Sequence, residues 1–77
     1  MIDVAPLRAA RDFLELGVMD LWIAYFELGG TQDAAHLHAY LDGEGETSPG
    51  DHDVIVHALN EVFLDRGLDH PLDYAMP

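Results

Sequence analysis

Five histidines and fifteen carboxylates are the residues of this sequence that could do chemistry, and the chemistry they suggest is metal binding. Asp53 and His57 stand four residues apart, so on a helix they share one face, and His52 adds a further donor at the start of the same segment. His36 and His38 are two residues apart, a spacing that points them to different sides of a helix. Two or three ligands on one exposed face fall short of the three or four that a zinc site requires. We therefore expect a solvated helix face, with no metal and no cofactor.

The pair His52-Asp53 is preceded by His36 and followed by two further aspartates, Asp65 and Asp69. This order superficially resembles the H…HD…D arrangement of the HD-type phosphohydrolases, a family that uses a larger helical domain to bring its ligands together. The spacings in this chain are short, and no family is assigned from them. What the resemblance implies is a small metal-dependent hydrolase, the weakest of our hypotheses. Its residues would be His36, His52, Asp53 and His57.

No other catalytic arrangement is indicated. Ser48 is the only serine, and it stands before Pro49 and three residues before Asp51, where a helix N-cap is expected. There is no cysteine, so thiolate catalysis and sulfur-ligated metal sites are excluded. No glycine-rich loop follows a predicted strand, so a phosphate-binding loop has no support. We expect a protein that is not an enzyme and has no catalytic residues.

The charge balance of the chain limits the kinds of partner that it can bind. The chain has fifteen acidic residues, three arginines and no lysine, which gives a formal net charge of −12. Such a surface repels phosphate backbones and anionic membranes, so we expect no direct binding to nucleic acid and no membrane association. A basic protein is the partner that the charge favours, although acidity also serves solubility or adaptation to a salty cytoplasm. The start of the chain lacks the basic region of a secretory signal, so we expect a cytoplasmic protein.

Helical periodicity dominates the sequence, which predicts an all-α fold: one domain over residues 1–77, a compact bundle of three or four helices with an extended C-terminal tail over 67–77. We expect helices over about 4–28, 32–41 and 49–66, with Asp3, Thr31 and Ser48 as N-caps. Leucines at every seventh position from Leu7 to Leu28 mark the face of the first region that points to the core. Gly17 interrupts this region, and a break there is slightly favoured over one long helix.

The segment from 18 to 28 is apolar almost all round, because only Asp20 and Glu27 interrupt it. Trp22, Tyr25 and Phe26 are interpreted first as core residues, and as interface residues in the alternative. Few other elements are available to surround such a helix in a chain of 77 residues, so either it is the central helix of the bundle or another chain covers part of its surface. The residues expected at that interface are Met19, Trp22, Ile23 and Phe26.

These features predict a non-catalytic protein–protein interaction or regulatory module, with either a basic protein or a second copy of the chain as its partner. A second hypothesis is an acidic mimic of nucleic acid that sequesters a basic DNA-binding protein. The sequence does not distinguish a functional acidity from one that serves solubility.

Overall fold

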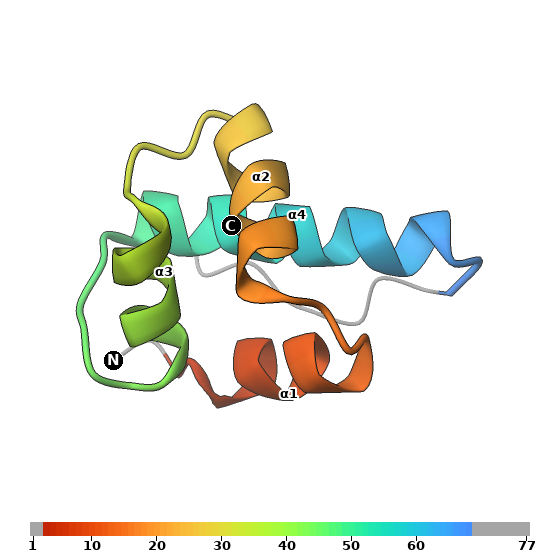
Figure 1. Cartoon of the computed structure of the whole chain (residues 1–77), viewed down its shortest axis with the longest axis horizontal. Helices are drawn as coiled ribbons and strands as arrows, with labels where there is room; N and C mark the ends of the chain where they lie inside the picture. The colour runs from red at the N-terminus through yellow and green to blue at the C-terminus, as the bar shows by residue number, and fades with distance from the viewer. Residues whose placement is uncertain (1–2, 69–77) are drawn as a thin grey trace.

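The computed structural model describes residues 3–68, which form four helices: α1 (Ala5–Phe13), α2 (Val18–Glu27), α3 (Ala34–Leu41) and α4 (Pro49–Asp65). The predicted all-helical fold is confirmed. The longest helix, α4, runs through the middle of the molecule, with α1 below it, α2 crossing it and α3 near its N-terminal end (Figure 1). Apart from Gly67 and Leu68, the tail predicted over 67–77 lies outside the described residues.

One buried core joins the four helices. The predicted leucine stripe supplies the contributions of α1 and α2, because Leu7, Leu14 and Leu21 are all buried together with Tyr25. The apolar residues at helical spacing in α3 and α4 complete the core. The buried apolar residues of these two helices are Leu37, Tyr40, Leu41, Ile55, Val56, Ala58, Leu59 and Phe63.

The first predicted region breaks into two helices, and the break is centred before Gly17. α1 ends in a Schellman motif, in which the Leu16 amide donates to the Arg11 carbonyl and the Glu15 amide to the Asp12 carbonyl, both at 3.1 Å. Glu15 adopts a left-handed backbone with φ of 52°. Gly17 has an extended backbone and serves as the N-cap residue of α2. The break was therefore predicted correctly, but the residue that turns the chain is a glutamate.

Glycine is the residue that usually occupies the left-handed position of this motif, because a Cβ atom there is strained. The other three helices follow this rule, with Gly29, Gly43 and Gly67 at positive φ. Replacing Glu15 with glycine is expected to stabilise the fold by about 1 kcal/mol, since the strain of the left-handed glutamate is removed. Urea denaturation measures the change. Glu15→Ala keeps the Cβ atom, so an equal gain in that variant would contradict the explanation.

The N-caps are partly as predicted. The Ser48 hydroxyl accepts the Asp51 amide at 3.1 Å, and Pro49 occupies the first turn of α4, so this start is confirmed. The predicted cap Thr31 is wrong: Asp33 caps α3 by accepting the His36 amide at 2.8 Å, and the helix begins at Ala34. At the start of α1, the N-cap residue is Val4, although the Asp3 carboxylate accepts the Ala5 amide.

The two short N-terminal helices do not pack on each other. Within residues 3–68, α1 packs on α3 and α4, and α2 packs on the same two helices, whereas no Cα atom of α1 lies within 8 Å of one in α2. Two arginines tie α1 to the rest of the chain: Arg8 Nε donates to the Leu41 carbonyl at 2.9 Å, and Arg66 donates to the Leu14 carbonyl at 2.7 Å. Both arginines therefore serve the fold.

Candidate functional site

Three of the six large hydrophobic side chains that are exposed in the described chain lie on the outer surface of α2. Met19, Ile23 and Phe26 are 54%, 48% and 58% exposed, and they follow one another at the spacing that places side chains on one side of a helix. Trp22 is partly buried and lies beside them. We call these four residues the α2 face. The core interpretation of Phe26 is therefore wrong, while that of Tyr25 is confirmed, since Tyr25 is buried.

The α2 face is held in place by the loop that follows it. The indole Nε1 of Trp22 donates to the Gln32 carbonyl at 2.9 Å, and the indole ring stacks on Phe26 with centroids 5.2 Å apart. This bond fixes the orientation of the largest side chain of the face. The surface therefore has a shape that is set before any partner arrives, which lowers the entropy cost of binding.

On the inner side of α2, the Tyr25 hydroxyl organises the same loop. It accepts the amides of Thr31 and Gln32 at 3.1 and 3.0 Å, and it donates to Asp51 of α4 at 3.3 Å. One buried hydroxyl thus joins α2, the loop before α3 and the start of α4. The sequence indicated a buried Tyr25, but it gave no signal for this set of partners.

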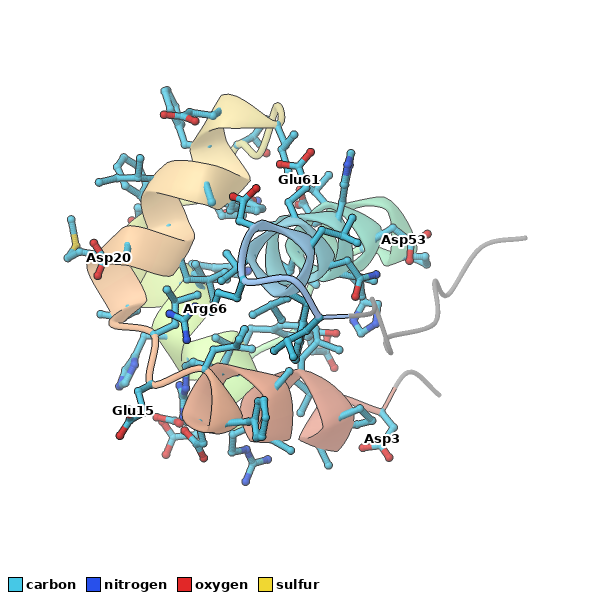
Figure 2. The ribbon with its side chains drawn as sticks, turned by 90° about the vertical axis from the view of Figure 1, so that its right-hand side faces the viewer. Asp3, Glu15, Asp20, Asp53, Glu61 and Arg66 are labelled. Atoms are coloured by element: carbon cyan, nitrogen blue, oxygen red, sulfur yellow. The ribbon has the colours of Figure 1, made fainter. Side chains whose placement is uncertain are left out.

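Two carboxylates border the α2 face. Asp20 and Glu27 are exposed, and neither takes part in an ion pair within the described part of the chain. Figure 2 shows Asp20 projecting outward from α2 on the side away from α4, while Asp3, Glu15 and Asp53 project from other sides of the molecule. The negative charge is therefore spread around the surface, and part of it adjoins the exposed apolar residues.

The residues predicted as possible metal ligands do not come together. Residues 3–68 contain no group of three or more His, Asp or Glu side chains placed to hold a metal ion. His57 Nε2 lies 3.2 Å from the Glu61 carboxylate, one turn further along α4, and His38 lies 3.2 Å from Asp42 in the same way. Both histidines are solvated residues on exposed helix faces. Asp69 of the HD-like pattern lies outside the described residues.

The sequence predicts His52 on a solvated helix face, but in the structure this residue is buried. It is 3% exposed, and its Nδ1 lies 2.7 Å from the Tyr40 hydroxyl in a hydrogen bond between α4 and α3. The tautomer of the ring sets which of the two groups donates. Burial lowers the pKa of His52, and the Asp53 carboxylate raises it to a lesser extent. Burial also raises the pKa of the Tyr40 hydroxyl, so the pair favours a neutral tyrosine beside a neutral histidine.

The lowered pKa of His52 predicts a loss of stability in acid. The unfolded chain takes up a proton on this histidine near pH 6.5, before the folded chain does, so stability is complete above that pH and falls as the pH drops toward the folded pKa. The melting temperature should therefore decline from pH 7.5 to pH 5.5 more in the native chain than in His52→Gln. Equal declines in the two proteins would contradict the assignment.

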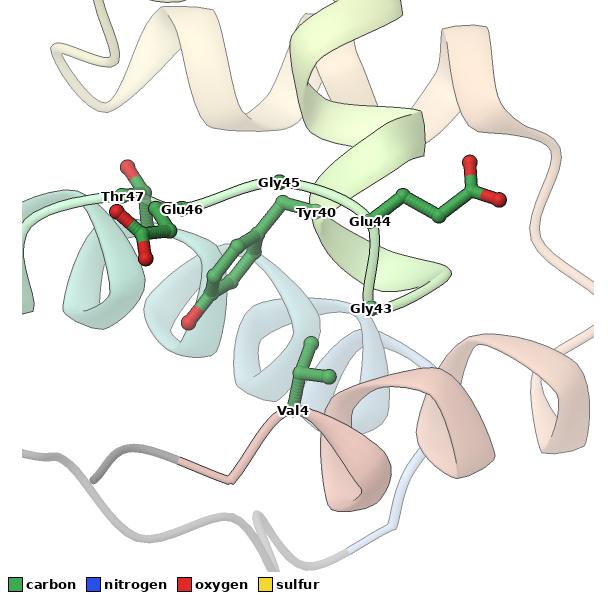
Figure 3. Close-up of a pocket in the computed structure, with 7 residues that line it drawn as sticks. All are labelled: Val4, Tyr40, Gly43, Glu44, Gly45, Glu46 and Thr47. Atoms are coloured by element: carbon green, nitrogen blue, oxygen red, sulfur yellow. The ribbon is translucent and has the colours of Figure 1, made fainter.

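A surface hollow of about 550 Å³ lies between the start of α1 and the loop before α4. Val4, Tyr40 and the residues from 43 to 47 line it. Figure 3 shows the side chains of Glu44 and Glu46 extending in opposite directions along the loop, so their carboxylates do not converge on the Tyr40 ring. The Thr47 hydroxyl donates to Asp51 at 3.3 Å.

Comparisons with known proteins supply no relative: a scan against family models, a search of curated proteins and a search of solved structures each find no match to this chain. Among the described helices, none is both long enough and apolar enough to cross a bilayer.

Proposed function

We propose that this chain is a non-catalytic protein–protein interaction module that binds its partner through the α2 face. The observation that carries the proposal is the row of three large apolar side chains, Met19, Ile23 and Phe26, each about half exposed on two turns of one helix. Single exposed hydrophobic residues are ordinary, but a contiguous group of them marks an interaction surface. Trp22 adds a residue type that is enriched among those that dominate binding energy.

The packing of the molecule supports this choice of surface. The helix is already anchored on its inner side by Leu21 and Tyr25, both buried, and Met19, Ile23 and Phe26 are not part of the core. The other strongly exposed phenylalanine, Phe13, stacks on Phe63 at the end of α1, on a helix that has no contact with α2. Phe13 therefore provides a matched control for Phe26.

The test compares three tagged proteins as baits in lysate of the source cells: the native chain, Phe26→Ser and Phe13→Ser. A partner that uses the α2 face should be retained by the native chain and by Phe13→Ser, and lost at least tenfold from Phe26→Ser, which corresponds to about 1.4 kcal/mol. Melting curves establish that both variants fold. Equal recovery of every captured protein by all three baits would refute the proposal.

Self-association is measured separately by sedimentation of the purified chain. A dimer that Phe26→Ser dissociates would identify a second copy as the partner, and the chain would still be an interaction module. A regulatory role follows if the partner loses an activity when the module is bound.

The net charge of −12 favours a more specific form of the proposed function, in which the partner is a basic DNA-binding protein that the module sequesters. That version predicts an association that weakens steeply between low and high salt, and competition by DNA. Binding that is indifferent to salt would rule it out.

A further inference from the structure

The α2 face is bordered by charge on one side only. Successive residues of a helix are rotated by about 100°, so Asp20 and Glu27 lie about 40–60° beyond Ile23 around the axis of α2, while Trp22 lies on the opposite flank. The exposed surface of α2 therefore has an aromatic flank, a central apolar row and an acidic flank. A partner that matches it must carry apolar side chains in a row and positive charge along one edge.

A second copy of the chain does not supply that positive charge. The sequence has no lysine, and each of its three arginines already bonds to its own chain. Arg8 and Arg66 donate to backbone carbonyls at 2.9 and 2.7 Å, and Arg11 lies 3.2 Å from Asp12. Two copies docked through α2 would bring uncompensated carboxylates together, and each copy has a net charge of −12.

From this complementarity we infer that the occupant of the α2 face is a basic amphipathic helix of another protein. Its apolar residues pack along Met19, Ile23 and Phe26, and its Lys or Arg residues lie along the flank formed by Asp20 and Glu27. The exposed row runs from Met19 to Phe26, a rise of about 10 Å along the helix, so two to three turns of a partner helix cover it. The inference rests on the proposed function and adds the chemistry of the partner.

The probe is a synthetic helical peptide of about 15 residues, with leucines in one row and lysines along one flank, and without tryptophan. Trp22 is the only tryptophan of the sequence, so its fluorescence reports binding directly at the face. We expect saturable binding by this peptide. The affinity should fall at least tenfold between about 50 mM and about 500 mM salt, because the charged flank is exposed to solvent.

Two peptide controls separate the proposed mode from general attraction to an acidic protein. A scrambled peptide of the same composition has the same charge but no apolar row, and it should bind at least tenfold more weakly. An amphipathic peptide with glutamate in place of lysine has the row without the positive flank, and it should not bind. Equal affinity for the lysine peptide and either control would overturn the inference.

Two matched pairs of variants locate the binding. Phe26→Ser should weaken binding of the lysine peptide at least tenfold, while Phe13→Ser should not. The double variant Asp20→Asn/Glu27→Gln should weaken it several-fold more than Glu44→Gln/Glu46→Gln, which removes two exposed charges from the loop before α4. Equal effects of the two double variants would show that only net charge matters and would overturn the inference.

Failure of this inference is distinct from failure of the proposed function. If no peptide binds but Phe26→Ser still releases a cellular partner or dissociates a dimer, the α2 face is an interface and the occupant inferred here is wrong. If Phe26→Ser changes neither peptide binding nor any cellular association, both statements are wrong.

Discussion

Replacing Gly30 with alanine is expected to destabilise the fold by about 3 kcal/mol or more. A Cβ atom at this position would lie only 2.3–2.5 Å from three carbon atoms of the Tyr25 ring. That ring cannot move aside, because it is buried and its hydroxyl bonds to two backbone amides and to Asp51. A chain of this length is stable by roughly 4–12 kcal/mol in total, so the substitution removes a large share.

Urea denaturation of Gly30→Ala at 25 °C measures this loss, with Gly50→Ala as the control. A Cβ atom at Gly50 would meet only the Ser48 hydroxyl oxygen, at an ordinary 3.8 Å, and the position lies in the first turn of α4. Gly50→Ala should be neutral or slightly stabilising, because alanine favours a helix more than glycine does. If both alanine variants unfold at the same urea concentration, the close approach of Gly30 to Tyr25 is not important for stability.

Tyr25→Phe should cost about 2–4 kcal/mol, although it removes only one oxygen atom. The hydroxyl accepts the amides of Thr31 and Gln32, and without it both donors lose their partner in the protein. Each backbone donor that is left unsatisfied costs about 1–3 kcal/mol where water does not replace the bond. The loss should therefore exceed that of an ordinary hydrogen bond.

Amide hydrogen exchange tests the cause as well as the size of this effect. In Tyr25→Phe, exchange at Thr31 and Gln32 should accelerate more than at amides inside α4, because the substitution releases the loop before it weakens the whole fold. A destabilisation below about 0.5 kcal/mol, or a uniform acceleration throughout the chain, would be evidence against the role assigned to the hydroxyl.

The sequence predicts most of the helices because their ends use residues with strong local preferences. Gly29, Gly43 and Gly67 stop three helices at a left-handed residue, and Ser48 with Pro49 starts α4. The end of α1 uses Glu15 in the same conformation, and a glutamate gives no local sign of it. The error of two residues at the start of α3 has a similar origin, since Thr31 and Asp33 are both good caps by residue type, and in the structure Asp33 caps the helix while the Thr31 amide bonds to Tyr25.

The burial of His52 could have been predicted from spacing. It stands three and four residues before Ile55 and Val56, so it belongs to the inward row of α4 that continues to Leu59 and Phe63. The interpretation of His52 as a possible metal ligand with Asp53 and His57 did not take into account that His52 lies on the inward side of α4. Its partner Tyr40 could not have been foreseen, because that bond depends on how α3 lies against α4.

For the candidate site, the sequence indicated which helix has surplus apolar residues but not which of them remain exposed. Tyr25 and Phe26 are neighbours of similar character, yet Tyr25 is buried and Phe26 is 58% exposed. The difference follows from the rotation of α2 relative to α3 and α4, which is a property of the assembled bundle. Binding at Met19, Trp22, Ile23 and Phe26 remains a prediction.

The absence of contact between α1 and α2 within the described helices has a consequence for the order of folding. The packing partners of α1 are α3 and α4, which begin more than 20 residues after α1 ends. A short helix gains little stability alone, so α1 depends on contacts with helices that follow it much later in the chain. Among the four described helices α1 is synthesised first, but it gains its packing partners only after α3 and α4 have been synthesised.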